Sequence, residues 1–250
     1  MRRRLIFNAD DYGLTAGVSA GILQAARGVV RSTTVLANVV APEEARELGH
    51  SGISAGVHLN LSYGPPLTAA YPPALLNPDG SFDKRRALDA RNWRSAQYRQ
   101  AARAEWQAQI ECAGELGLTP DHLDSHHHVH LLPALFPLAL GLARERGLSL
   151  RVRQQQVAEA RGAGVRTPET LVEGYYGRGN IAQGRLLELL SAASGDVVEV
   201  MCHPGRVDQQ LMQISGYAGE RAEELACLGD KRLAKMLEEA GWQISGYVWG

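Results

Sequence analysis

Five of the eight histidines lie within residues 122–133, which read His-Leu-Asp-Ser-His-His-His-Val-His-Leu-Leu-Pro. A cluster this dense binds a cation or moves protons. The alternative is a surface histidine run or a purification remnant, but a tag sits at a terminus. This run lies in mid-chain, between an apolar-polar strand pattern and a helix opened by proline. The stretch therefore predicts the centre of a metal site.

Two adjacent carboxylates, Asp10 and Asp11, follow a short apolar run. Because adjacent carboxylates repel, they share a site favourably only if a cation or a shared proton compensates. The alternative is an N-cap pair for the helix that Thr15 precedes. Two imidazoles with one carboxylate leave coordination positions open for water and substrate, as a catalytic metal requires.

The histidine cluster allows two backbone geometries. Strand alternation would place Asp124, His126 and His128 on one face and His127 on the other. A helix would instead make His126 and His130 neighbours. His126 faces the site in both cases and is the predicted ligand. His127 is the expected bystander, whereas His128 and His130 are candidates for contacts to a ligand or to substrate.

Two further histidines stand at strand ends. His58 lies in an alternating strand that runs into a proline-rich loop, with a core histidine as the alternative. His203 precedes Pro204 and is either a turn residue or a general acid, because imidazole titrates near neutral pH. His50 and His122 are expected to be structural.

Two arginines follow a later strand. Arg151 and Arg153 are candidates for orienting the Asp10 carboxylate or binding an anionic group of the substrate. Surface arginine is the alternative for both, since most arginines in proteins are exposed.

The elements that must position these residues alternate along the whole chain. Strands are expected at residues 5–7, 32–38, 53–61, 122–125, 150–153, 197–202 and 243–248. Helices are expected at residues 15–27, 42–48, 87–116, 133–145, 181–193, 218–228 and 231–240, with a long loop at 62–83 and irregular chain at 154–179. This order predicts one α/β domain over residues 1–250 with parallel strands, either closed as an irregular barrel or left open. The polar clusters all follow strand ends, the edge at which such barrels build active sites.

Composition narrows the function. The 250 residues carry 26 Lys+Arg and 27 Asp+Glu, so the net charge of -1 lacks the footprint of a nucleic-acid binder. The three cysteines share no C-x-x-C spacing, which indicates neither disulfides nor a thiolate zinc site and favours a reducing cytoplasm. No run approaches the ~18 apolar residues of a membrane span. We therefore expect no nucleic-acid partner and no integral membrane segment.

Four segments, in order and across nearly the whole chain, resemble the YdjC-like (ChbG/HpnK) carbohydrate deacetylases. They are Asn8-Ala9-Asp10-Asp11-Tyr12-Gly13, Gly56-Val57-His58-Leu59-Asn60-Leu61 with Gly64-Pro65-Pro66-Leu67-Thr68, the run from His122 to His130, and Glu199-Val200-Met201-Cys202-His203-Pro204. The resemblance implies an irregular (β/α) barrel of the NodB-related deacetylase type. It also implies a homodimer and one divalent metal ion, magnesium by resemblance, with zinc or manganese as alternatives. The implied substrate is a small N-acetylated carbohydrate, with or without a phosphate or lipid, that loses its acetyl group.

Carried over position by position, the resemblance makes Asp11, His58 and His126 the metal ligands. It makes Asp10 the base that takes a proton from water and His203 the acid that protonates the leaving amine. The metal would polarise the acetamide carbonyl and lower the pKa of water. The cluster departs from the spaced His-Ser/Thr-x-x-His pattern of NodB enzymes, so its last histidine inherits no ligand role.

Two other readings fit parts of the sequence. A barrel metallophosphoesterase or amidohydrolase also places His and Asp at strand ends, often around two metals about 3.5 to 4 Å apart. A non-catalytic sugar- or metal-binding protein would keep the ligands alone. Asp10 and His203 argue against it, because binding needs neither an extra carboxylate nor an acid.

Overall fold

The computed structural model describes residues 3–247 and 249, and its strands form one sheet. The strands are β1 (Arg3–Tyr12), β2 (Ser32–Val35), β3 (Ser54–Leu59), β4 (His122–Ser125), β5 (Ser149–Leu150), β6 (Thr170–Val172), β7 (Val197–Cys202) and β8 (Trp242–Ser245). The α-helices are α1 (Ala16–Ala25), α2 (Pro42–His50), α3 (Lys84–Leu88), α4 (Ala96–Glu115), α5 (Phe136–Arg146), α6 (Val157–Gly162), α7 (Gln183–Ala192), α8 (Gln209–Ile214), α9 (Gly219–Leu228) and α10 (Lys231–Glu239). Short 3₁₀ helices are η1 (Pro73–Leu75), η2 (Asn92–Arg94), η3 (His126–Leu131) and η4 (Gln154–Gln156).

The paired strands of this sheet all run parallel, in the order β5-β4-β3-β2-β1-β7-β6. β7 occupies one edge of β1, while β8 and β2 share the other edge, β8 beside Arg3 to Ile6 and β2 beside Asn8 to Tyr12. Within the described residues no ladder joins β5 to β6, so the curled sheet stays an open half-barrel. The predicted irregular (β/α) barrel is confirmed.

Strand alternation separates an apolar outer face from a polar inner face. On β1, Leu5, Phe7 and Ala9 belong to a large apolar cluster under the helices, whereas Asn8 and Asp10 are buried polar residues. The same alternation recurs on the neighbouring strands. The buried polar residues that follow this alternation include Ser32 and Thr34, His58, His122 and Asp124, and Glu199. The half-barrel interior is therefore a polar chamber inside an apolar shell.

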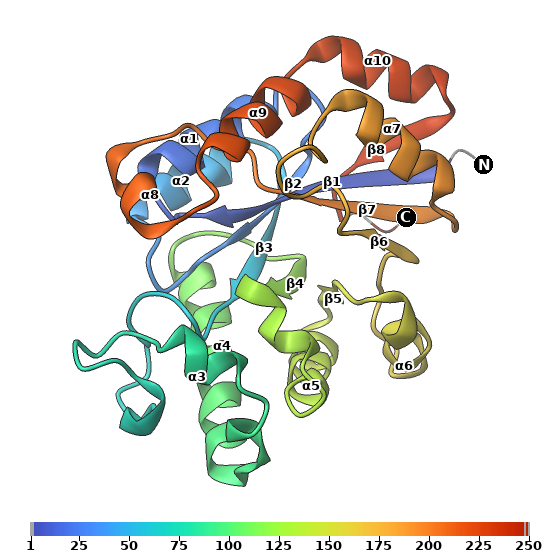
Figure 1. Cartoon of the computed structure of the whole chain (residues 1–250). Helices are drawn as coiled ribbons and strands as arrows, with labels where there is room; N and C mark the ends of the chain where they lie inside the picture. Colours follow the sequence, from blue (N-terminus) through green and yellow to red (C-terminus); the bar gives the residue numbers. More distant parts are fainter. Residues whose placement is uncertain (1–2, 248, 250) are drawn as a thin grey trace.

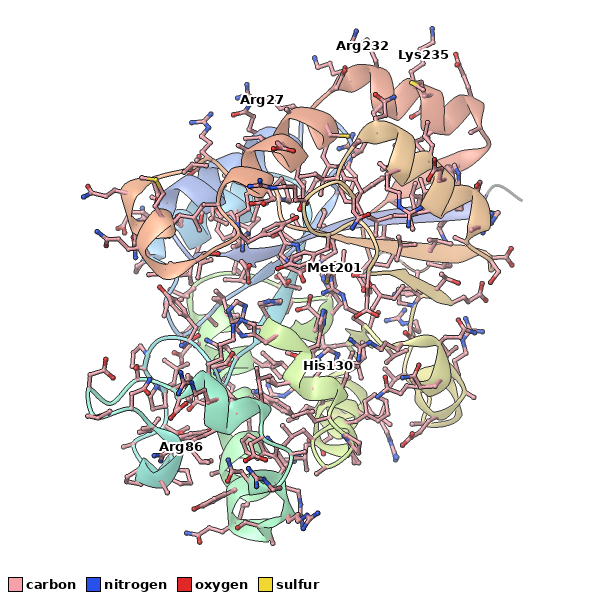
Figure 2. All side chains as sticks on the ribbon, in the orientation of Figure 1. Arg27, Arg86, His130, Met201, Arg232 and Lys235 are labelled. Atoms are coloured by element: carbon pink, nitrogen blue, oxygen red, sulfur yellow. The ribbon has the colours of Figure 1, made fainter. Side chains whose placement is uncertain are left out.

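Helices cover the outer face in two groups (Figure 1). One group contains α1, α2, α7, α9 and α10, and the other contains α4, α5 and α6. Each group lies over its own apolar cluster, and Trp93 and Trp106 are fully buried in the second. Figure 2 shows His130 and Met201 at the centre of the molecule and Arg86 and Arg232 at its periphery. Among the described residues, no helix is both long and apolar enough to cross a membrane.

Several boundaries differ from the sequence-based prediction. The helix expected over 87–116 begins only at Ala96, because Ser95 accepts a hydrogen bond from the backbone of Tyr98 and caps α4 there. The helix expected from residue 133 begins at Phe136. Strand β6 lies in the stretch expected to be irregular. The last strand was expected to reach Val248, which lies outside the described residues.

Candidate metal centre and active-site pocket

A pocket of about 790 Å³ opens at the carboxyl ends of the strands, and the five residues predicted to be catalytic or metal-binding line it. They are Asp10, Asp11, His58, His126 and His203. Parallel strands end at one edge of a sheet, so residues far apart in sequence meet there. The residues that were expected to act together therefore do share one cavity.

A bulge at the end of β1 brings both carboxylates into this pocket. Alternation alone would turn Asp11 to the outer face, away from Asp10. The register between β1 and β2 shifts between Ala9 and Tyr12, and Asp11 has a φ of 75°. This left-handed conformation, uncommon outside glycine, re-aims the side chain. Thr15 caps α1, so the alternative that the two aspartates are its N-cap is wrong.

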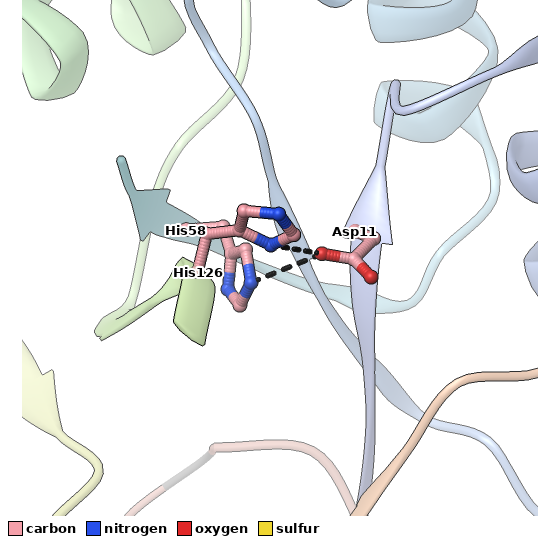
Figure 3. A group of neighbouring side chains, drawn as sticks. All are labelled: Asp11, His58 and His126. Carbon is pink, nitrogen blue, oxygen red and sulfur yellow. Dashed lines mark ion pairs between the residues drawn. The ribbon is translucent and has the colours of Figure 1, made fainter. Parts of the chain in front are cut away.

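Asp11, His58 and His126 form a compact group of potential metal ligands (Figure 3). His58 Nε2 lies 3.2 Å and His126 Nδ1 lies 2.8 Å from Asp11 Oδ1. That oxygen is buried and accepts no hydrogen bond of good geometry. A buried carboxylate oxygen that faces two imidazole nitrogens without a hydrogen bond suits a cation, so the donor set fits a divalent metal.

A proton on His58 and the guanidinium of Arg221 offset the negative charge of the carboxylates around this group. His58 Nδ1 lies 2.7 Å from Asp124 Oδ1, which fixes the ring and leaves Nε2 for a metal. Burial by itself lowers the pKa of His58, but the carboxylates of Asp124 and Asp11 outweigh it and raise that pKa to about 10. Burial raises the pKa of Asp11, yet His126 and Arg221 hold it well below its usual range.

Asp10 is fixed by a bidentate ion pair. Arg151 Nη1 and Nη2 lie 2.6 and 2.7 Å from its two oxygens, and Asn8 Nδ2 donates to Oδ1 at 2.9 Å. Arg151 is fully buried behind the pocket rather than exposed. Arg153 instead pairs with Glu173 at 2.7 Å on the pocket wall.

His203 enters the pocket just after β7. Its Nε2 lies 3.9 Å from Asp10 Oδ2. Burial lowers the pKa of His203 to about 4, although the Asp10 carboxylate opposes that shift. The rings of Tyr176 and Tyr217 lie edge-on to it, at centroid distances of 5.3 and 5.8 Å. The imidazole therefore sits neutral between a carboxylate and an aromatic wall.

The histidine cluster follows neither expected geometry. Chain direction changes in η3 because His127 and His128 adopt φ values of 54° and 55°. As a result His127 lines the pocket, with Nδ1 2.8 Å from Ser62 Oγ, and the expectation that it faces away is wrong. His128 also lines the pocket, with Nε2 3.7 Å from Glu173 Oε1.

His130 lies outside the pocket lining and is fully buried. Its Nδ1 lies 2.5 Å from Ser125 Oγ, and its Nε2 lies 2.9 Å from the carbonyl oxygen of Arg151. Both ring nitrogens thus have hydrogen-bond partners within the protein. His130 therefore connects the end of β4 to the Arg151 backbone and is not a substrate contact. Asp124 is also behind the pocket, where it contacts His58 and, at 2.8 Å, Arg151 Nη1.

Sequence reasoning missed two charged residues of α9. Arg221 Nη2 lies 2.5 Å from Asp11 Oδ2, and Glu224 accepts hydrogen bonds from the Tyr217 hydroxyl and the His203 backbone, at 2.6 and 2.5 Å. A signal was present: positions 221 and 224 fall on the same helical face as Leu225 and Leu228, where only apolar residues are expected.

Comparisons with known proteins agree with this geometry. The sequence model of the family described as YdjC-like protein matches residues 4–239. A protein of Yersinia pestis (strain Pestoides F), named chitooligosaccharide deacetylase, is 36% identical over 262 residues, 99% of each chain. A crystal structure from Enterococcus faecalis V583, described as a candidate cellobiose-phosphate cleavage protein, shares 31% identity with a TM-score of 0.86 and covers 99% of this chain and 98% of that one.

A more distant structure shares the fold. The family 4 carbohydrate esterase from Streptomyces lividans, in complex with acetate, has a TM-score of 0.53 at 14% identity and covers 98% of this chain and 92% of its own. With the family model matching nearly all of the sequence, and with the strand-end site in place, the chain belongs to the YdjC-like family.

Proposed function

We propose that this protein is a metal-dependent hydrolase that removes acetyl groups from N-acetylated carbohydrates. One observation carries the proposal: the Asp11, His58 and His126 group shares a pocket with Asp10 and His203. A ligand set with a further carboxylate and a further imidazole beside it can bind a metal and also move protons. The relative named chitooligosaccharide deacetylase supports the same reaction.

Asp11, His58 and His126 would hold one divalent ion. When bound, that ion supplies an electrophile for the acetamide carbonyl and lowers the pKa of water. Magnesium follows from the family resemblance, while two imidazoles suit zinc and manganese as well. Arg221 holds the second oxygen of Asp11, so that carboxylate offers one oxygen to the ion.

Asp10 acts as the base and His203 as the acid. The bidentate contact with Arg151 keeps Asp10 in a single orientation with Oδ2 toward His203. Because the pKa of His203 lies near 4, its imidazole is neutral at pH 7 and must gain a proton before it can protonate an amine. Asp10 Oδ2, at 3.9 Å, is placed to pass on the proton that it takes from water.

An aromatic wall suits a sugar ring. Tyr176 stacks on Tyr217 with centroids 4.4 Å apart and planes 16° apart, and it keeps 45% of its surface exposed. Tyr217 is fixed by its hydrogen bond to Glu224. The partly exposed ring of Tyr176 lies beside His203, the proposed acid, and can bind the apolar face of a pyranose. We also propose a single domain, on the alternation of strands and helices, and a cytoplasmic location, on the unpaired cysteines. A homodimer is proposed on the resemblance alone.

The deciding experiment measures acetate release from N-acetylglucosamine monomers and oligomers. Chelator-stripped protein is assayed alone and then with magnesium, manganese or zinc. Release that depends on the added ion supports the deacetylase. Two ions per chain would favour the metallophosphoesterase or amidohydrolase alternative. One bound ion with no release from any substrate would favour the non-catalytic binding protein.

A further inference from the structure

Glu199 belongs to the motif at the end of β7, yet the proposed reaction gives it no role. Its carboxylate is fully buried on the inner face of the half-barrel. Oε1 lies 2.7 Å from Arg151 Nε and 2.6 Å from Nη2. Oε2 accepts a hydrogen bond from the Tyr247 hydroxyl at 2.5 Å. Glu199 therefore links the arginine that holds Asp10 to a residue beyond the last strand.

The ring of Tyr247 is held in place by stacking on His122. Its ring lies parallel to that of His122, with centroids 3.8 Å apart and planes 5° apart. His122 Nε2 lies 3.0 Å from Asn8 Oδ1, and Asn8 in turn donates to Asp10. Tyr247 thus reaches Asp10 by two routes, one through Glu199 and one through its stacking partner.

The Tyr247 hydroxyl can influence how strongly the Arg151 guanidinium binds each of its carboxylate partners. That guanidinium contacts three buried carboxylates, those of Asp10, Asp124 and Glu199. Each carboxylate competes for it, and a second donor on one of them weakens that competition. Without the Tyr247 hydroxyl, Glu199 Oε2 would be buried with no partner, and the carboxylate would draw Arg151 away from Asp10.

The direction of this hydrogen bond is settled by the environment of the phenol. Burial and the neighbouring carboxylate raise the pKa of Tyr247 well above its usual range. The hydroxyl therefore stays protonated and donates a hydrogen bond to Glu199 Oε2.

We propose that Tyr247 is a positioning residue for Asp10, acting through Glu199 and Arg151. The residue after the last strand thereby sets the orientation of the proposed base at the other end of the barrel. The kinetic readout of this inference rests on the proposed deacetylase function, whereas its spectroscopic readout rests on the contacts alone.

Tyr247→Phe tests the inference, because it keeps the ring stacked on His122 and removes only the hydroxyl. We expect kcat for acetate release to fall about tenfold, the scale seen when outer hydrogen-bond partners of a site are removed. KM and bound metal should stay unchanged. The matched control is Tyr175→Phe, which removes an equally buried hydroxyl that donates to the carbonyl oxygen of Ile181 at 3.0 Å. This control should lower thermal stability to a similar extent and leave kcat at the wild-type value.

A double-mutant cycle separates a positioning role from a structural one. Glu199→Gln interrupts the same link one step closer to Arg151. If Tyr247 acts through Glu199, adding Tyr247→Phe to Glu199→Gln should cost no further activity. Independent, multiplying losses would overturn the inference, and so would a Tyr247→Phe variant with the kcat of the control.

Hydrogen exchange of the Arg151 Nε proton gives a readout without turnover. Its signal in ¹⁵N-labelled protein is identified by its loss in Arg151→Lys. We expect at least tenfold faster exchange in Tyr247→Phe than in Tyr175→Phe. Unchanged exchange would overturn the link itself. A wild-type protein that releases no acetate would refute the proposed function, and this exchange measurement would still decide the role of Tyr247.

Discussion

Asp10 and Asp11 are neighbours on β1, yet both carboxylates enter one pocket and each is bound by a different arginine. Arg151 holds Asp10 from inside the half-barrel, and Arg221 holds Asp11 from α9. The bulge at Asp11 makes this arrangement possible. Because their supports are separate, the two carboxylates can be altered independently.

Asp10→Asn should abolish most activity and keep the metal. Removing a general base typically costs about 10²- to 10⁴-fold in rate. Because Asp10 is outside the proposed ligand group, metal content measured by emission spectroscopy should remain at the wild-type level. Asp11→Asn is the contrasting variant and should lose the ion. Activity of Asp10→Asn close to wild type would show that another group is the base.

Metal affinity should increase with pH across the neutral range. Without metal the pKa of His58 is raised to about 10, so its imidazole is protonated at pH 7 and must lose that proton to bind an ion. Affinity should therefore rise about tenfold per pH unit below that pKa. Calorimetric titration in buffers of different ionisation enthalpy should show about one proton released per ion by this competition. A pH-independent affinity with no proton release would contradict this assignment.

Tyr176→Ala should weaken substrate binding with little effect on the chemical step. The ring lines the pocket, is 45% exposed and stacks on Tyr217, and it is not one of the proposed metal ligands. Losing one stacked ring should raise KM about tenfold, on the scale of the 1 to 3 kcal/mol of a stacking contact. Tyr176→Phe keeps the ring and should retain the wild-type KM. If Tyr176→Phe raises KM as much as Tyr176→Ala does, the tyrosine hydroxyl rather than the ring face binds the substrate.

Glu224→Gln should remove a pH-dependent loss of stability. Burial raises the pKa of Glu224 to about 7, even though Tyr217 and the His203 backbone donate to it. A carboxyl with a raised folded-state pKa gives a stabilisation that is complete below about pH 4.5 and is lost as pH rises to about 7. The difference in unfolding free energy between wild type and variant should change by on the order of 3 kcal/mol over that range. Denaturant titrations of chelator-stripped protein measure it, and parallel pH profiles would refute the raised pKa.

The sequence predicted that polar residues gather at the carboxyl edge of the sheet, because the signals of strands and motifs are local. Alternation on β3 and β4 indicated which side of each strand is polar, and the ordered motifs indicated that His58 and His126 belong to one site. The alternation pattern does not indicate where the backbone conformation interrupts the two-residue period of a strand. The left-handed residues Asp11 and His127 each redirect a side chain that alternation would place elsewhere.

Long-range pairing was also beyond sequence reasoning. The helical face that Arg221 shares with apolar residues indicates burial, but only the fold shows that its partner is Asp11. The β6 strand is only three residues long, Thr170–Val172, and its identity depends on its pairing with β7. Such short elements carry too few residues for a periodic signal.

The pairing of β1 has a consequence for how the protein is made. Phe7 pairs with Val200, and Leu5 pairs with Ile244, so the pairing of the first strand is complete only when β7 and β8 are in place. During translation this apolar strand leaves the ribosome long before the segments that cover its edges. Unfinished chains thus expose a sticky edge that chaperones recognise and that favours aggregation. The half-barrel can therefore be completed only after the last strands have been synthesised.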